Sequence, residues 1–404
     1  MRVLYFHQHF STPKGATGIR SYEMAKRLIK RGHDVTMVCG SYGGGNTGLI
    51  SSFEKGRREG VVDSIRIIEF DIAYSNNDGF IKRALTFFSF ALRSIRLALT
   101  EKYDVVFATT TPLTAGVPGI FARWFKRKPF VFEIRDLWPE LPREMGVITN
   151  PVILYLMGVL EWVSYHSSNR CIGLSPGIVK GIERCGISQE KIALVPNGCD
   201  LGIFGQASEP WRPEGVADND LMAIFTGTHG MANGLDSALD AAGELLKRGN
   251  QDVKIVLVGQ GKLKEGLQER AASENLSNVV FHDPVNKEKL SGLMKSADIG
   301  LQLLSNIPAF YYGTSPNKFF DYISAGLPVL NNYPGWLAEM INEKDCGFEI
   351  PPDDPIAFAD ALESAAGNKE SLKLMGANAL QLAQTFERGL LAEKWVDWVV
   401  EAKR

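Results

Sequence analysis

The sequence predicts an α/β protein with two domains, each built around a parallel sheet. Strand-like apolar segments alternate with amphipathic helix-like segments along the chain, which is the pattern of parallel α/β architecture. The chain has 404 residues, which is long for one core and suits two domains of about 200 residues each. Both halves open with a strand, a glycine-containing loop and a helix. Two Rossmann-like domains are therefore the economical interpretation.

The first domain is expected to span residues 1–200. Its opening strand is predicted at residues 2–10 ("RVLYFHQHF"), and a glycine-containing loop leads into an amphipathic helix at residues 19–32. Further strands are predicted at residues 33–40, 104–110, 130–134, 170–175 and 191–198. The segment "SYGGGNTG" at residues 41–48 lacks the G-x-G-x-x-G spacing, so it is interpreted as a flexible connection.

The second domain is expected to span residues 201–385, beginning with a turn-rich link near residues 200–215. Its strands are predicted at residues 222–230, 254–261, 279–283 and 299–304, and helices at 234–249 and 316–325. The last residues, 386–404, contain "LLAEKWVDWVVEAK" and are predicted to form a separate C-terminal helix.

Composition and charge exclude several classes of protein. A net charge of −2 argues against a general nucleic-acid binder, which is normally basic. The five cysteines are scattered and form no C-x-x-C pair, which fits a reducing cytoplasm without disulfides or a zinc site. The start "MRVLYFHQHF" enters a strand pattern directly, so no signal peptide is expected. No apolar run reaches the ~20 residues that span a bilayer.

The stretch "SPNKFFDYISAGLPVL" at residues 315–330 carries the signals of a helix that runs into a strand. Ser315 is expected to be the N-cap, and Pro316 the first helical residue, where its missing N–H costs nothing. Gly326 is expected just past the end of the helix, and Pro328 prevents any continuation.

Lys318 is unusual in this helix because a cation is unfavourable near the positive end of the helix dipole. A bound phosphate would resolve that conflict, since the free amides of Asn317 and Lys318 point out of the N-terminus. Asp321 lies on the same face, three residues after Lys318. The alternative is a helix with a surface salt bridge between Lys318 and Asp321.

Five segments, in this order and spacing, resemble glycosyltransferase family 4, a family of retaining, nucleotide-sugar-dependent enzymes. They are "RSYEMAKRLIKRGHDVTMV", "IALVPNGCDLGIF", "IVLVGQG", "ADIGLQLL" and "SPNKFFDYISAGLPV". The segments "GATGIRSYE", "TTTPLTAG" and "EIRDLWPE" look most like transferases, including amino-sugar transferases, that build bacterial O-antigen and capsule. The resemblance implies a GT-B fold, with two parallel sheets facing across a cleft and residues 386–404 crossing back to the N-terminal domain.

The resemblance also implies a donor site in the second domain. The family's Glu–seven residues–Glu motif places Asp321 at the second Glu, which binds the ribose, and Gly313 at the first. The carboxylate that usually contacts the donor sugar is therefore missing. Lys318 is expected to replace the Arg and Lys that neutralise the diphosphate in the family. Further donor contacts are expected from Ser315, Asn317, Gly227, Thr228, His229, Asn233 and Val285.

Candidates in the first domain follow its first strand. His7 and His9 alternate along that strand and share one side, but two histidines without a third ligand do not predict a metal site. His9 is instead expected to line the cleft beyond the carboxyl end of the strand. Gly15 and Gly18 would let the next loop approach a ligand closely. Arg20 is expected to meet an acceptor or donor phosphate, with a solvated arginine as the alternative.

Arg135 and Asp136, in "FEIRDLWPE", are predicted to be catalytic. They follow a buried-looking strand, at the place where the family usually carries a histidine near the reacting sugar. Asp136 would orient or deprotonate an acceptor hydroxyl. A charge pair that caps the strand end is the alternative, and Glu133 and Glu140 are weaker candidates.

Residues 80–100 and 123–128 combine aromatic and aliphatic side chains with basic ones. Such a mixture is typical of helices that lie on a membrane surface, so an anionic membrane is an expected partner. The alternative is a helix packed on the sheet with a solvated cationic edge.

The sequence as a whole predicts a cytoplasmic glycosyltransferase, peripheral at the inner face of the plasma membrane. The donor is expected to be a UDP-sugar, and the acceptor a polyprenyl-linked or free saccharide. No metal or other cofactor is expected. A GT-B-fold UDP-sugar epimerase and a non-catalytic nucleotide-sugar-binding protein are the alternatives. An NAD-dependent dehydrogenase is poorly supported, because neither domain has a G-x-G-x-x-G fingerprint after its first strand.

Overall fold

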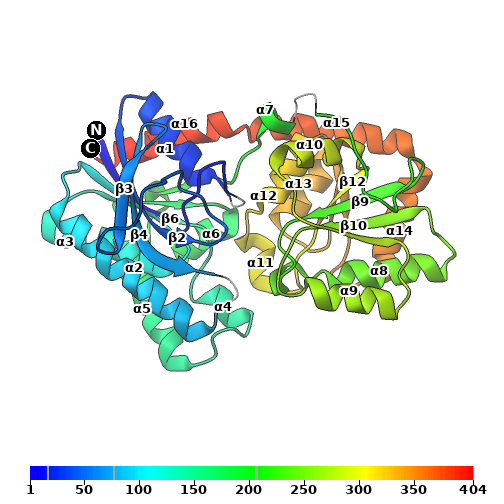
Figure 1. Ribbon diagram of the computed structural model, residues 1–404, viewed down its shortest axis with the longest axis horizontal. Coiled ribbons are helices and arrows are strands. Elements are labelled where there is room, and N and C mark those ends of the chain that lie inside the picture. The colour runs from blue at the N-terminus through cyan, green and yellow to red at the C-terminus, as the bar shows by residue number, and fades with distance from the viewer. Residues whose placement is uncertain (16–17, 76–77, 205–207, 404) are drawn as a thin grey trace. The chain divides into compact units, whose positions relative to one another are not determined.

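The computed structural model describes residues 1–15, 18–75, 78–204 and 208–403 (Figure 1). Its contacts divide the chain into two compact units. The first unit consists of residues 1–196, 313–315 and 389–404, and the second of residues 197–312 and 316–388. Residues 205–207 of the predicted link lie outside the described residues.

The first unit is built on an eight-stranded sheet with the order β3-β4-β2-β1-β5-β6-β7-β8. The strands are β1 (Arg2–Phe6), β2 (Asp34–Tyr42), β3 (Arg57–Val62), β4 (Ile65–Tyr74), β5 (Val105–Thr109), β6 (Phe130–Ile134), β7 (Arg170–Gly173) and β8 (Ile192–Leu194). All neighbours are parallel except β3 and β4, which form an antiparallel hairpin at one edge. Every residue of β5 and β6 is buried, as expected for central strands covered on both faces.

Helices surround this sheet (Figure 1). They are α1 (Arg20–Lys30), α2 (Phe80–Thr100), α3 (Val117–Lys126), α4 (Glu140–Glu144), α5 (Pro151–Ser167), α6 (Pro176–Arg184) and α16 (Arg388–Glu401). The strand order reverses between β1 and β5, because β2 lies on one side of β1 and β5 on the other. Ligands of open α/β sheets bind outside the carboxyl ends of the strands at such a point.

The second unit is built on a six-stranded, fully parallel sheet with the order β11-β10-β9-β12-β13-β14. The strands are β9 (Leu221–Thr226), β10 (Val253–Val258), β11 (Val279–His282), β12 (Ile299–Gln302), β13 (Val329–Asn331) and β14 (Gly347–Glu349). Here the order reverses between β9 and β12, so the carboxyl end of β9 is the expected ligand position.

The helices of this half are mostly short. They are α7 (Leu201–Phe204), α8 (Asp236–Lys247), α9 (Lys264–Ser273), α10 (Lys287–Ser296), α11 (Pro308–Gly313), α12 (Asn317–Ser324), α13 (Trp336–Lys344), α14 (Pro355–Gly367) and α15 (Lys369–Thr385). No helix in the described part of the chain is both long enough and apolar enough to cross a membrane.

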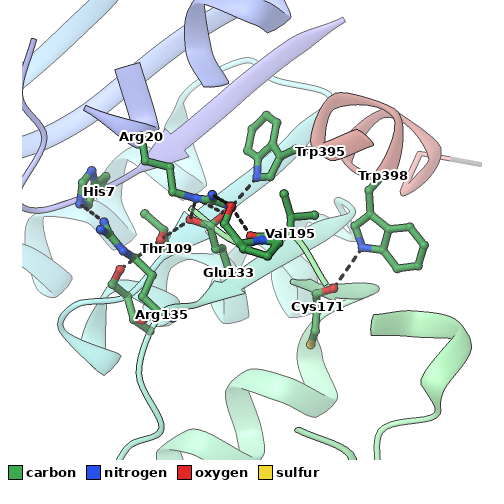
Figure 2. A network of polar contacts seen from close by, with 11 residues as sticks. His7, Arg20, Thr109, Glu133, Arg135, Cys171, Val195, Trp395 and Trp398 are labelled. Atoms are coloured by element: carbon green, nitrogen blue, oxygen red, sulfur yellow. Dashed lines mark hydrogen bonds and ion pairs between the residues drawn. The ribbon is translucent and has the colours of Figure 1, made fainter. Parts of the chain in front are cut away.

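The last helix, α16, packs on the first unit through a buried tryptophan. The Trp395 ring lies 5.9 Å from the Tyr5 ring and 4.7 Å from the Phe107 ring, measured between centroids. Trp395 Nε1 also donates to Glu133 Oε2 over 3.1 Å (Figure 2). Residues 389–404 therefore complete the core that the first 196 residues begin.

Candidate functional site

Helix α12 begins one residue later than the sequence predicts. Its N-cap is Pro316, with φ −73° and ψ 128°, and no side chain caps the helix. The prediction that Ser315 is the N-cap is therefore wrong. Proline disfavours helical geometry in the residue before it, and Pro316 itself has an extended ψ, so the first helical residue is Asn317.

The predicted end of α12 is confirmed. Gly326 follows the C-cap Ala325 with a φ of +71°, a left-handed geometry that favours glycine. Its N–H donates to the carbonyl of Ile323, and the N–H of Leu327 donates to the carbonyl of Tyr322. These two bonds form a Schellman motif, which satisfies the last carbonyl groups of the helix.

Tyr322 attaches α12 to the ends of the central strands. Its hydroxyl accepts a hydrogen bond from the Thr226 N–H at the end of β9, over 2.9 Å. The same hydroxyl donates to the Leu301 carbonyl of β12, over 3.4 Å. A side chain at Gly300 would collide with the Tyr322 ring, so glycine permits this close contact. The helix is thereby held at the point where the strand order reverses.

Lys318 extends from the first turn of α12 over the loop that follows β9. Its Nζ donates to Asn233 Oδ1 over 2.6 Å and lies 4.2 Å from the centre of the Phe225 ring. A Cβ added to Gly227 would lie 3.5 Å from Cε of Lys318. No carboxylate among the described residues forms an ion pair with this ammonium, so the alternative of a salt bridge to Asp321 is wrong. Desolvation by burial lowers the pKa of Lys318 to about 7.

The loop after β9 brings several predicted donor residues together. Gly227 and Thr228 are exposed, and Asn233 Nδ2 donates to the Thr228 carbonyl over 2.7 Å. Asn233 thus joins the loop to Lys318. Asn317 is exposed at the first helical position and Ser315 is half-buried.

His229 differs from the expectation that it contacts the donor. Its side chain is fully buried, and neither ring nitrogen has a hydrogen-bond partner among the described residues. Desolvation, together with the charges of Lys264 and Lys318, lowers the pKa of His229 to about 4, so the ring is neutral. The ring lies between Phe225 and Phe281, with centroid distances of 6.1 and 6.3 Å. His229 therefore supports the loop from within the unit.

Asp321 of α12 lies near three charged side chains, those of Asp200, Lys287 and Arg388. Burial raises its pKa to about 6; Asp200 adds to the rise, whereas Lys287 and Arg388 oppose it. Asp200 is itself paired, with Arg388 Nη2 at 3.0 Å and Lys287 Nζ at 3.1 Å. No ion pair or hydrogen bond engages the Asp321 carboxylate among the residues that the structure describes. The carboxylate is therefore not committed to a structural role.

Two other predicted donor positions are less constrained. A Cβ added to Gly313 would meet no atom within 4 Å apart from its chain neighbours and its own helix. Val285 is half-buried in the loop between β11 and α10. Its contact with the donor stays a prediction.

In the first unit, the structure corrects the position of the two histidines. β1 ends at Phe6, so His7 and His9 lie beyond the strand rather than alternating along it. Arg135 Nη1 lies 3.5 Å from His7 Nε2 (Figure 2). Desolvation and the charge of Arg135 lower the pKa of His7 well below its usual value and that of His9 to about 4. Within the described ranges, no three His, Cys, Asp or Glu side chains are grouped to hold a metal.

His9 lies against an aromatic cluster. Its ring is 4.4 Å from Tyr74 and 5.1 Å from Tyr42, measured between centroids. Arg83, from α2, places its guanidinium 5.8 Å from the centre of the Tyr74 ring. His9 is thus surrounded by aromatic rings and the charges of Arg83 and Arg135, which together oppose its protonation.

Asp136 lies at the carboxyl ends of β5 and β6. Its Oδ2 accepts a hydrogen bond from Thr111 Oγ1 over 3.0 Å, and the Arg135 N–H donates to Thr110 Oγ1 over 2.8 Å. Burial raises the pKa of Asp136, against the opposing effects of Arg135 and Thr111. Arg135 and Asp136 form no ion pair, so the alternative of a capping charge pair is wrong.

Arg20 is not placed at a phosphate site, and it is not a solvated arginine either. It is buried, and its Nη2 lies 2.9 Å from Glu133 Oε2 and 2.8 Å from the Val195 carbonyl (Figure 2). Nη1 donates to the Pro196 carbonyl over 2.6 Å. Burial alone would raise the pKa of Glu133, but the charge and hydrogen bonds of Arg20 lower it overall. Both residues are therefore committed to the core.

The glycine loop before α1 is described only in part, because residues 16 and 17 lie outside the described residues. Gly15 is packed against Ser11 and the backbone of Asn46, where a side chain would collide. Gly15 therefore permits a close contact within the first unit rather than with a ligand. Gly18 is exposed, and its proposed contact with a ligand stays a prediction.

Several contacts at these sites depend on tertiary structure, so the sequence does not predict them. Nothing in the local pattern indicates that Asn233 meets Lys318, which is distant in the sequence. The same holds for the Asp200 pair with Arg388. A buried partner of Glu133 is predictable from the sequence, because a charged residue inside the apolar run "FVFEI" requires one.

Two family models match the chain. Residues 17–202 match Glycosyltransferase Family 4, and residues 221–368 match Glycosyl transferases group 1. The chain is 23% identical over 357 residues to an uncharacterized glycosyltransferase of Methanocaldococcus jannaschii, a match that covers 85% of this chain and 83% of the relative. It is 26% identical over 230 residues to O-antigen chain mannosyltransferase C of Escherichia coli, covering 56% of this chain and 58% of that protein.

A solved structure supports the fold. HepE of Anabaena, in complex with UDP-glucose, superposes with a TM-score of 0.69 at 16% identity, covering 99% of this chain and all of the other (100%). The two matched models lie one in each half of the chain, and each half contains its own parallel sheet. The chain therefore carries a domain that matches Glycosyltransferase Family 4, followed by a domain that matches Glycosyl transferases group 1, and it has the GT-B fold.

Proposed function

We propose that the protein transfers a sugar from a UDP-sugar to a polyprenyl-linked or saccharide acceptor in bacterial surface polysaccharide biosynthesis. The resemblance of three motifs to surface-polysaccharide transferases supports the pathway, as does the O-antigen mannosyltransferase among the relatives. The UDP-glucose complex of a structural neighbour supports the donor class.

The observation that carries the proposal is the ammonium of Lys318 at the N-terminus of α12, which has no carboxylate partner in the described part of the chain. It lies beside the exposed Gly227 and Thr228, with the free amides of the helix nearby. Two negative phosphates would complete this environment, because helix N-termini and lysines both stabilise anions. Asp321, one turn further along α12, is proposed to bind the ribose hydroxyls.

The chemistry follows from these placements. The bond between the anomeric carbon and the diphosphate oxygen breaks, and the acceptor oxygen bonds to the same face of the sugar. Negative charge grows on the leaving diphosphate, where Lys318 and the helix amides stabilise it. No described side chain is an evident nucleophile, so a front-face displacement with retained configuration is favoured. We propose that no metal is required, because Lys318 supplies the charge.

The first unit is proposed to bind the acceptor. Asp136, held by Thr111, is proposed to orient or deprotonate the acceptor hydroxyl, and Arg135 to bind the reacting sugar or a phosphate of the acceptor. Burial already raises the pKa of Asp136, which brings it closer to that of a general base at neutral pH. The neutral His9 and its aromatic neighbours provide a surface on which a sugar ring can pack.

An anionic membrane is proposed as the partner that presents the acceptor, at the cytoplasmic face of the plasma membrane. Helix α2 packs on the sheet through Phe90 and Leu97, and its other side exposes Leu85 and Phe88. Neither α2 nor α3 contains an acidic residue, and both carry Arg or Lys. Binding to anionic vesicles should therefore weaken as salt rises, because salt screens the attraction. Equal binding to neutral and anionic vesicles, measured by sedimentation, would contradict this partner.

The test of the function is UDP release in the presence of a lipid-linked saccharide. Turnover that needs both substrates supports transfer. Conversion of UDP-sugar alone would identify an epimerase. Binding of the UDP-sugar without UDP release, whichever acceptor is added, would identify a non-catalytic binding protein. Screening UDP- and GDP-sugars by thermal shift selects the donor, because a ligand at 100 times its Kd adds ~2.7 kcal/mol to stability.

A further inference from the structure

Helix α5 carries a stripe of apolar side chains on the surface of the first unit. Val152, Tyr155, Leu156, Val159 and Trp162 are all largely exposed. Their spacing of three and four residues places them along one side of the helix. We refer to these five residues as the α5 stripe. Soluble proteins rarely expose so continuous an apolar patch without a binding function.

The composition of α5 is unsuited to a helix that faces water. Its 17 residues contain no Lys, Arg or Asp. Glu161 is the single acidic residue, and it accepts a hydrogen bond from the Tyr165 hydroxyl over 2.9 Å. Water-facing helices normally carry charged residues on the side opposite the core. The exposed side of α5 therefore matches an apolar environment.

The helices beside α5 indicate which apolar environment its exposed side would meet. Helix α3 packs against both α5 and α2, so the three helices form one side of the first unit (Figure 1). Trp124 and Phe125 of α3 are largely exposed, beside Arg123 and Arg127. An apolar stripe flanked by cations, without carboxylates on α2 or α3, is complementary to an anionic lipid surface.

We propose that α5 inserts into the boundary between headgroups and acyl chains of an anionic leaflet, while the cations of α2 and α3 contact the headgroups. A helix of 17 residues is ~26 Å long and lies flat in this layer. Tyr155 and Trp162 suit the interface, where one end of an aromatic side chain is apolar and the other wet. The inference deepens, and rests on, the lipid-linked acceptor of the proposed function.

This arrangement gives membrane binding two components with different salt responses. Attraction of the cations on α2 and α3 is screened by salt. Insertion of the α5 stripe depends on removing apolar surface from water, which salt does not screen. A part of the binding should therefore persist in high salt.

The experiment measures partition of the purified chain into phosphatidylglycerol–phosphatidylcholine vesicles at high salt. Leu156→Glu should weaken partition about tenfold or more, since a charge replaces a leucine that would otherwise leave water for the lipid layer. Leu374→Glu on α15 is the matched control, because Leu374 is 59% exposed and Leu156 is 60% exposed. The control should partition like the wild type. Trp fluorescence should shift to the blue on binding, and less in Trp162→Ala.

Three results would overturn the inference. The first is an unchanged partition of Leu156→Glu. The second is a wild-type dimer in light scattering that Leu156→Glu converts to a monomer with partition unchanged, because a second copy would then cover the stripe. The third is an equal loss for the Leu374→Glu control. Calorimetry with UDP separates this from the proposed function: Leu156→Glu should bind UDP normally, whereas a wild type that binds no UDP contradicts the donor site alone.

Discussion

The ammonium of Lys318 contacts an amide oxygen and an aromatic ring, but no carboxylate of the described chain. The ammonium therefore lacks a negative charge to balance it, and desolvation by burial lowers the pKa of Lys318 to about 7. A bound diphosphate would supply the missing charge and restore the proton. We therefore expect this side chain to bind the donor and to make donor binding depend on pH.

We predict that Lys318→Ala lowers turnover by roughly 100-fold or more, the effect of losing one group that stabilises a developing charge. Lys373→Ala, on the exposed side of α15, is the control and should be active. Activity of Lys318→Ala within about threefold of wild type would show that the diphosphate is bound elsewhere.

The pH dependence of UDP binding follows from the same residue. Below pH 7 Lys318 is already charged in the free protein, whereas above pH 7 it must take up a proton when the diphosphate binds. The affinity for UDP should therefore fall as pH rises through about 7, and calorimetry in buffers of different ionisation enthalpy should detect proton uptake. In Lys318→Ala this dependence should disappear. A flat profile in the wild type would contradict the assignment.

Asp321 and Asp136 are predicted to act in different steps. Asp321→Ala should weaken UDP binding by about 10- to 150-fold, because a hydrogen bond to a charged group contributes ~1.5–3 kcal/mol. Its effect should be mainly on KM, since the ribose contact is the same in ground and transition states. Asp136→Ala should lower kcat and keep UDP affinity. If calorimetry shows the reverse pattern, the donor site belongs to the other unit.

At the scale of elements, α12 depends on how it ends as much as on how it begins. Gly326 has a φ of +71° and provides the N–H of one Schellman bond. We predict that Gly326→Ala lowers the free energy of unfolding by about 1–2 kcal/mol, the cost of left-handed geometry for a residue with a Cβ. Chemical denaturation measures this.

The control for that substitution is Gly367→Ala at the end of α14. No atom lies within 4 Å of a Cβ at Gly367, and its φ is not in the left-handed region. The change should be neutral or stabilise by about 0.4–1 kcal/mol, because alanine restricts the unfolded chain. Equal destabilisation by both substitutions would show that the geometry of Gly326 is not the cause.

The elements differ in how far the sequence predicts them. The buried parallel strands, such as β6, appear as continuous apolar runs, and the predicted bounds of β6 match the structure. The sequence does not predict the β3–β4 hairpin, because β3 ("RREGVV") is a polar edge strand with alternating exposure. The sequence predicts β1 too long, because "HQHF" follows the apolar run without a turn signal. The strand ends at Phe6, although His7 and Gln8 still form backbone hydrogen bonds with β2.

The site was predictable where local chemistry defines it. The helix at Asn317–Ser324, its glycine stop and the basic residue in its first turn are all readable from the sequence. Arg20 was not, because its position in the helix cannot show that its guanidinium reaches Glu133, which is distant in sequence. Burial of His229 likewise depends on packing against Phe281 rather than on neighbours along the chain.

At the scale of the whole molecule, the contacts of Trp395 make the C-terminal residues part of the first unit. We predict that Trp395→Ala lowers the free energy of unfolding of this unit by about 3–5 kcal/mol, the usual cost of removing a buried tryptophan. Thermal denaturation measures this.

Trp398→Ala is the matched control on the same helix. The Trp398 side chain is only half-buried, and its Nε1 donates to the Cys171 carbonyl over 3.1 Å. Its loss should cost about 1–2 kcal/mol, because it removes one hydrogen bond and the contact of the Arg170 guanidinium, 4.2 Å from the centre of the Trp398 ring. Equal effects of the two substitutions would mean that the Tyr5 and Phe107 contacts do not hold α16.

The carboxylate of Glu133, which accepts hydrogen bonds from both Arg20 and Trp395, affects how the chain can fold while it is being synthesised. Arg20 and the Val195 carbonyl, which Arg20 contacts, leave the ribosome well before Trp395 does. At ~5–20 residues per second, the ~200 residues from Val195 to Trp395 take ~10–40 s to synthesise. During that time the nascent first unit has Tyr5 and Phe107 without their covering tryptophan. Until Trp395 emerges, Glu133 has only Arg20 and Thr109 as donors, so the unit can complete its core only after that point.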